Sequence, residues 1–160
     1  MLDRFMPWKR GEETARATEN LQVVLEMTLR CTLFFPRVAQ KLSLILPDSA
    51  APARLAAEYG PRMVAATDKL ASAISRLGAQ PRWYFDCPPD QLEPPNFCRD
   101  QVERLEQAVG MMRAVIPLLR DDAAQSELEE VISDFTKLIS TLHQIQEEMR
   151  IDWQAQTPAP

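Results

Sequence analysis

Residues 126–149 read SELEEVISDFTKLISTLHQIQEEM, and this stretch decides the fold. Its apolar residues recur at alternating spacings of three and four, the period of an amphipathic helix with one buried face. Ser126 and Glu129 form an S-x-x-E capping box, which predicts that the helix begins there. The predicted buried stripe consists of Leu128, Val131, Phe135, Leu138, Leu142, Ile145 and Met149.

Three upstream segments carry similar stripes and are predicted to be helices: about 14–46, 52–77 and 96–119, the last capped by Asn96. The first stripe is Leu21, Leu25, Thr28, Thr32, Phe35, Ala39 and Leu42. The second is Ala56, Tyr59, Met63, Ala66, Leu70 and Ile74, and the third is Val102, Leu105, Val109, Met112, Ile116 and Leu119. Prolines that should kink these helices are Pro36, Pro61 and Pro117.

The connections between the helices are short, long and short. Residues 47–51 offer Asp48 or Ser49 as a helix cap, whereas residues 78–95 hold five prolines and no sustained period. This order predicts an all-α, up-down-down-up four-helix bundle with one long crossover between helices two and three, as in ferritin-like proteins. We expect one domain over 1–160, with its core at about 14–153, a flexible N-terminal arm at 1–13 and a C-terminal tail at 154–160.

Composition excludes several classes of function. A net charge of -5 and a pI near 5.0 leave no basic surplus for nucleic acid. No apolar run is long enough to span a membrane, and residues 1–10 lack the apolar core of a signal peptide, so a cytoplasmic location is predicted. Cys31, Cys87 and Cys98 show no CxxC spacing, which indicates reduced thiols and no zinc site.

Local sequence resembles that of bacterioferritins. Residues 20–30, NLQVVLEMTLR, look like their first helix, with Glu26 where the family has a metal-ligating glutamate and Phe34 eight residues later. ATDKL at 66–70 and LGAQP at 77–81 resemble two stretches of the family's second helix and crossover. The resemblance is to the ferritin-like superfamily and implies its four-helix fold.

The chain departs from this family where the metal should bind. The family's two Glu-x-x-His motifs fall on MVAA at 63–66 and FTKL at 135–138, so all four ligands are missing. The family's haem methionine would correspond to Val64, so no haem is expected. The resemblance therefore implies a scaffold without a cofactor, whose dry centre is built from Met63, Ala66, Phe135 and Leu138.

Glu26, Glu106 and His143 are the polar residues that could be functional groups. Glu26 could be a surviving metal ligand, and Glu106 lies near the place of another, but pairing of Glu26 with Arg30 and solvent exposure of Glu106 are favoured. His143 follows Leu142 and should lie at the bundle edge without a catalytic role. The methionines of the helices are interpreted as core residues and not as copper ligands.

The crossover contains the densest aromatic cluster, Trp83, Tyr84 and Phe85, which is a candidate partner-binding surface. The alternative is that these side chains cover the side of the bundle. Residues 1–10 combine apolar and basic side chains, so they could anchor the chain, although a frayed arm is favoured.

The predicted function is non-catalytic: a ferritin-like interaction or assembly module, with itself or with a protein partner, that has lost its di-metal centre. One alternative is a metal-dependent oxidase or iron-storage protein with displaced ligands. Another is a carrier of a small apolar ligand in a core loosened by the prolines.

Overall fold

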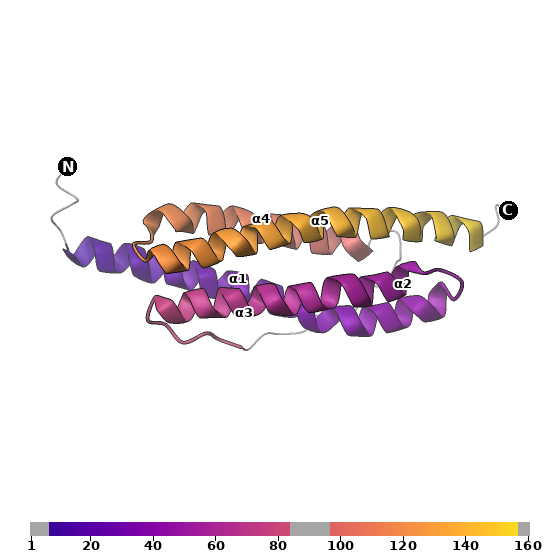
Figure 1. The fold of residues 1–160 in the computed structure, drawn as a ribbon, viewed down its shortest axis with the longest axis horizontal. Coiled ribbons are helices and arrows are strands. Elements are labelled where there is room, and N and C mark those ends of the chain that lie inside the picture. The colour runs from indigo at the N-terminus through magenta and orange to yellow at the C-terminus, as the bar shows by residue number, and fades with distance from the viewer. Residues whose placement is uncertain (1–6, 84–96, 157–160) are drawn as a thin grey trace.

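A computed structural model of the chain describes residues 7–83 and 97–156, which form helices and connections and contain no strand. Figure 1 shows the fold. The helices are α1 (Pro7–Ile45), α2 (Ala51–Arg54), the π-helix η2 (Leu55–Tyr59), α3 (Gly60–Arg76), α4 (Phe97–Val115), the 3-10 turn η3 (Ile116–Leu118) and α5 (Asp122–Gln156). Because α2, η2 and α3 follow one another without a break, they form a single rod.

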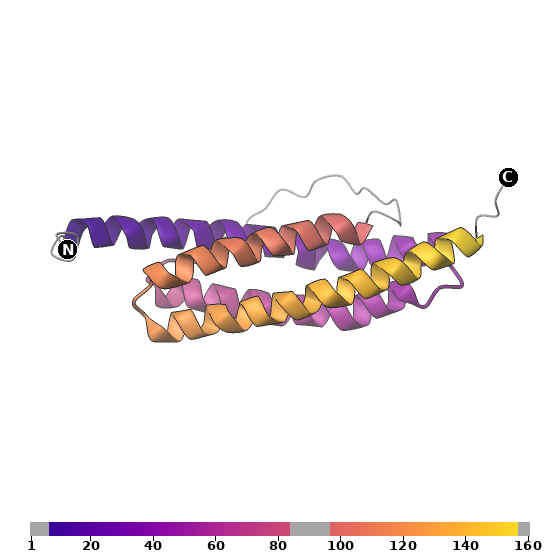
Figure 2. The same cartoon turned by 90° about the horizontal axis from the view of Figure 1, so that it is seen from above.

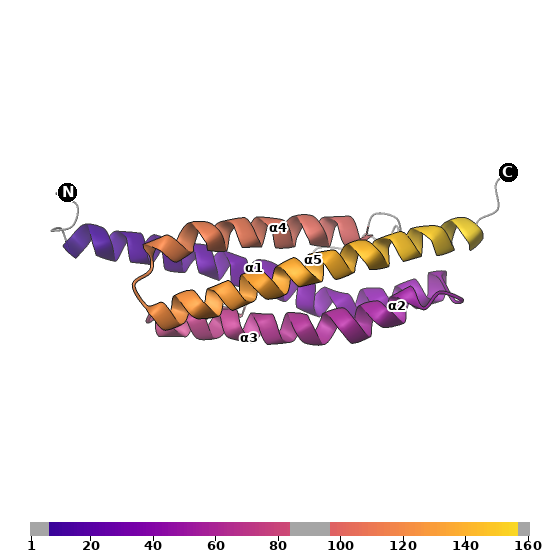
Figure 3. The same ribbon diagram turned by 45° about the horizontal axis from the view of Figure 1, so that its top comes forward.

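The long helices lie side by side along one axis, as Figures 1 and 3 show. α1 contacts α3 and α4, and α5 contacts the same two helices. α3 ends near one end of the molecule, whereas α4 begins well toward the other end and runs in the same direction as α3 (Figure 2). The end of α3 at Arg76 and the start of α4 at Phe97 are therefore offset along the length of the bundle.

Apolar periodicity explains why these segments are helical, and the core confirms most of the predicted stripes. Every member of the last stripe is fully buried, from Leu128 to Met149. In the first and third stripes only Thr32 and Ile116 are partly exposed. The second stripe is wrong at its start, since Ala56 is exposed and Leu55 is buried in its place.

The π-helix explains this error. The buried residues Ala51, Leu55, Tyr59 and Met63 are spaced by four, which overshoots one α-helical turn at each step. A π turn holds more residues than an α turn, so the π segment keeps Leu55 and Tyr59 on the core side. Pro61, the second residue after the π-helix, lacks the N–H that would close an α turn, which favours a different bonding pattern at this point.

Several predicted boundaries are corrected. α1 begins at Pro7 and not near Thr14, and it continues through Pro36. α5 begins at Asp122: the Asp121 carboxylate accepts the Ala124 N–H at 2.9 Å, so Ser126 lies inside the helix and is not its cap. The added residues 7–13, PWKRGEE, carry no repeating apolar stripe, which is why periodicity missed them.

Two further ends differ from expectation. α4 stops at Val115, and Pro117 lies in the 3-10 turn η3 and not inside an α-helix. α5 continues to Gln156, whose side-chain amide donates to the Ile45 carbonyl at 2.6 Å and ties this end to α1. The N-cap of α2 is Ala50 and not Asp48 or Ser49, although the Ser49 hydroxyl, one residue earlier, accepts the Ala51 N–H at 3.2 Å.

Ion pairs show that the α2–η2–α3 rod and α5 keep one antiparallel register. Lys69 pairs with Asp134 at 3.0 Å and Arg76 pairs with Glu127 at 2.9 Å, so both helices advance seven residues between these pairs. Arg54 pairs with Glu148, so between this pair and the Lys69 pair the rod advances 15 residues and α5 advances 14. The rod therefore holds one extra residue in the stretch that contains the π-helix.

Among the described residues, no helix combines the length and the apolar character that crossing a bilayer requires.

Candidate functional site

The four positions expected to replace metal ligands lie in the core. Met63 and Ala66 on α3 and Phe135 and Leu138 on α5 have no exposed surface, and α3 contacts α5. The expectation that they are core residues is confirmed. Their only side-chain heteroatom is the Met63 thioether, so these four side chains present no carboxylate or imidazole to an ion.

The two carboxylates considered as metal ligands lie elsewhere. Glu26 is half exposed and accepts a hydrogen bond from the Arg30 guanidinium at 3.1 Å, which confirms the predicted i, i+4 pair. Glu106 is exposed on α4, as predicted. Within residues 7–83 and 97–156, no group of three or more His, Cys, Asp or Glu side chains is placed to hold a metal ion.

A polar layer inside the core was not predicted. The Cys31 thiol on α1 donates to the Gln101 side-chain oxygen on α4 at 3.0 Å, and both residues are buried. Cys98, one turn before Gln101, and Tyr59, the last residue of η2, are also fully buried. The Tyr59 hydroxyl has no hydrogen-bond partner among the described residues. A sequence signal did exist, since Cys98 and Gln101 have the i, i+3 spacing of one helix face.

Burial makes these groups hard to ionise. It raises the pKa of Cys31 to about 11, although the neighbouring Arg104 guanidinium opposes the shift, and it raises the pKa of Cys98 to about 12. Burial also raises the pKa of Tyr59, and the two thiols nearby add to that effect. Because the thiolate is the reactive form of cysteine, neither thiol is suited to nucleophilic chemistry at neutral pH.

His143 lies on the rim of a groove between α4 and α5 and is exposed, so its predicted place at the edge is confirmed. The groove encloses about 420 Å³, and Val102 and Glu106 are among its lining residues. Two of the charged residues that line this groove, Arg150 and Glu147, pair with each other. Among the residues that the structure describes, the lining of this groove includes no Ser or Cys that could act as a nucleophile beside the imidazole.

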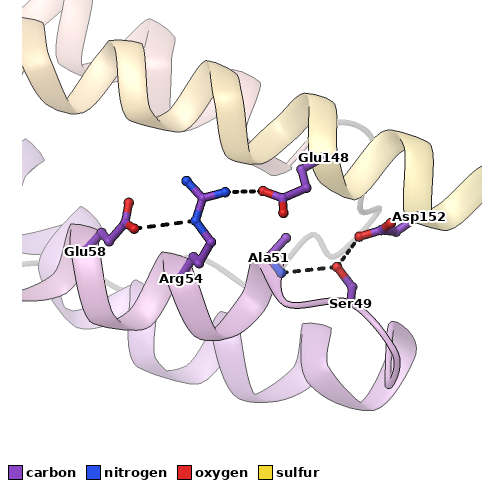
Figure 4. A network of polar contacts seen from close by, with 6 residues as sticks. All are labelled: Ser49, Ala51, Arg54, Glu58, Glu148 and Asp152. Atoms are coloured by element: carbon purple, nitrogen blue, oxygen red, sulfur yellow. Dashed lines mark hydrogen bonds and ion pairs between the residues drawn. The ribbon is translucent and has the colours of Figure 1, made fainter.

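A polar network joins the start of the α2–η2–α3 rod to the end of α5, as Figure 4 shows. The Ser49 hydroxyl donates to Asp152, and the Arg54 guanidinium reaches Glu148 on α5 and Glu58 on its own rod, the latter at 3.4 Å. All of these contacts satisfy one another across the two helices. The network therefore ties α5 to the rod, and each of its charged groups already has a protein partner.

The beginning of the crossover is held on α1 by a glutamine that the sequence analysis missed. The buried Gln22 side chain donates to the Gln80 carbonyl at 2.9 Å and accepts the Arg82 N–H at 3.0 Å. The Arg82 guanidinium also pairs with Glu19. Trp83, the next residue, is 54% exposed.

The structure therefore tests only part of the predicted aromatic surface. Trp83 is exposed beside α1, as a partner-binding residue would be, whereas Tyr84 and Phe85 lie outside the described residues. Comparison with known proteins found no matching family model, no matching curated protein and no matching solved structure. Function has to be inferred from the residues of this chain.

Proposed function

We propose that this chain is a ferritin-like four-helix bundle that has lost its di-metal centre and acts, without catalysis, as an interaction module. The observation that carries the proposal is the complete burial of Met63, Ala66, Phe135 and Leu138. An ionised carboxylate at such a place is costly without a cation, so loss of the metal favours apolar residues there.

The arrangement of helices supports the ferritin-like part of the proposal. α1 packs mainly against α3 and α4, and α5 packs mainly against the same two helices. Together with the lengthwise offset between the end of α3 and the start of α4, this is the packing expected of an up-down-down-up bundle with one long crossover (Figure 2).

The interaction part of the proposal is supported by an exposed aromatic residue on the described surface. Trp83 is exposed directly after Arg82, whose backbone N–H is held by Gln22 and whose guanidinium pairs with Glu19, and exposed aromatic residues on a fixed backbone suit protein contacts. We also propose a cytoplasmic location, and the free thiols of Cys31 and Cys98 support it.

Metal analysis tests the loss of the di-metal centre. Protein is purified without chelator from cells grown with added iron and manganese, and both metals are measured per chain together with the rate of Fe²⁺ oxidation. We expect metal far below one ion per chain and no oxidation above the rate of buffer. Two iron or manganese ions per chain would overturn the proposal in favour of a ferritin-like oxidase or storage protein whose ligands are displaced.

A further inference from the structure

Ion pairs connect the α2–η2–α3 rod to α5 at three levels along their shared seam, which Figure 3 shows. The pairs are Arg76 with Glu127, Lys69 with Asp134, and Arg54 with Glu148. At each level a cation of the rod meets a carboxylate of α5, so the two helices are complementary in charge there. The stretch between the Lys69 and Arg54 levels departs from this pattern.

Two cations lie in that stretch without a carboxylate of their own. Arg62 on α3 and Lys137 on α5 are exposed, and neither side chain has an ion pair or hydrogen bond with another described residue. The register of the seam explains this. Seven residues before Lys69 and seven after its partner Asp134, the facing positions are Arg62 and Thr141, so a hydroxyl stands where the other levels have a carboxylate.

A pocket opens at this place in the seam. It encloses about 350 Å³ and is lined by Arg62, Ala65, Lys69, Asp134 and Lys137. Ala65 lies between Arg62 and Lys69 on one face of α3, and its methyl group leaves space that a longer side chain would fill. The lining carries three positive charges and one negative charge, in a chain whose net charge is -5.

Lys69 is only partly committed to its carboxylate partners. Its ammonium pairs with Asp134 at 3.0 Å and with Glu130 at 3.5 Å. An ammonium group has three N–H donors, so one of them is left for a further acceptor. Lys69 can therefore hold the two carboxylates at the edge of the pocket and still contact an anion inside it.

We propose that this pocket binds a phosphate group, either as free phosphate or as the phosphate of a small soluble ester. The planar Arg62 guanidinium matches an edge of the phosphate with two N–H donors, and the lysines add compact charges. A phosphate monoester carries about 1.5 to 2 negative charges at neutral pH, which the net charge of the lining balances. This site goes beyond the interaction function proposed above, because its ligand is a small molecule.

The surroundings of the pocket set its strength. Arg62 and Lys137 are exposed, and water weakens charged contacts at such positions. Glu58, one turn before Arg62, pairs with Arg54 at 3.4 Å and adds a negative charge beyond the rim. We therefore expect weak binding, with a Kd on the order of 1 mM at low salt. Added salt at about 0.15 M should weaken it several-fold, because it screens the charges over about 8 Å.

Nuclear magnetic resonance of the full chain, labelled with ¹⁵N and titrated with inorganic phosphate, tests the proposal. The amide signals of residues 62–69 and 134–137 should shift and saturate, whereas sodium chloride at the same ionic strength should not reproduce the shifts. A second titration with glycerol 3-phosphate separates the two sources of the group. Tighter binding of the ester identifies an ester as the ligand, and tighter binding of phosphate identifies the free ion.

Two variants act on the pocket itself. Arg62→Gln with Lys137→Gln removes both free cations and should weaken phosphate binding by about tenfold or more. Ala65→Glu places a carboxylate among the cations, four residues before Lys69, the favourable order for an ion pair on a helix. It should abolish phosphate binding while the unfolding temperature stays at or above that of the wild type.

A matched control separates the pocket from the overall charge of the chain. Arg113→Gln with Arg120→Gln removes the same two charges from exposed positions on and after α4 and should leave the phosphate Kd unchanged within about twofold. Equal weakening by this control, shifts that chloride reproduces, or no saturable shift up to about 20 mM phosphate would overturn the proposal. Persistence of binding in a folded Ala65→Glu variant would overturn it as well.

Discussion

Replacing Phe135 by Ala should lower the free energy of unfolding by about 3–5 kcal/mol. The side chain has no exposed surface and lies on the α5 face that contacts α3, so its removal loses both burial and packing. Domains of this size are stable by only about 5–15 kcal/mol, so the loss is a large share of the total. At about 2–4 °C per kcal/mol, the unfolding temperature should fall by roughly 6–20 °C.

Urea unfolding followed by far-ultraviolet circular dichroism measures this change. Thr136→Ala is the matched control, because Thr136 is the next residue of α5 and is exposed. It should change the free energy of unfolding by no more than about 0.5 kcal/mol. A Phe135→Ala variant that unfolds at the wild-type urea midpoint would refute the placement of Phe135 in the core, and with it the alignment on the ferritin-like motifs.

Tyr59→Phe should raise the free energy of unfolding by about 1 kcal/mol in the same assay, because it removes a buried hydroxyl that has no partner among the described residues; a loss of stability would show that the hydroxyl is hydrogen-bonded. Cys31 and Cys98 should resist a thiol reagent at pH 8 in the folded chain and react after unfolding in urea. Their pKa values rise on folding from 9.0 to about 11 and about 12, so the folded state binds more protons above pH 9 and stability should fall as pH rises from 9 to 12; a flat profile there would contradict their burial. Gln22→Ala removes two hydrogen bonds to the crossover and should speed tryptic cleavage after Arg82 several-fold, measured by mass spectrometry, and an unchanged rate would show that other contacts hold this segment.

Periodicity alone predicted where the helices are and which side of each is buried. The stripe from Leu128 to Met149 is buried without exception, because a repeat of three and four residues matches only one helical period. The same method failed at Ala56, because it assumes α-helical spacing throughout and cannot detect a π turn. The capping box at Ser126 failed for a related reason, since an S-x-x-E pattern inside a helix looks the same as one at its start.

The polar features of the molecule were harder to predict. The Glu26–Arg30 pair is local and was predicted from spacing. The contact of Cys31 with Gln101 joins residues 70 positions apart, and Gln22 meets a backbone segment 58 positions away. No local pattern specifies such pairs, because they depend on which helices become neighbours.

The extra residue in the α2–η2–α3 rod has a consequence for how the length of this chain can change. Removal of one residue anywhere between Lys69 and Arg76 would rotate one half of the rod by about 100° and separate ion pairs that now advance in step. Removal of Ala56 or Ala57 would instead take away the surplus, since both are exposed and lie in the π segment. The rod could then continue as a plain α-helix with its partners on α5 still opposite, so the π-helix marks the place where this scaffold tolerates a deletion.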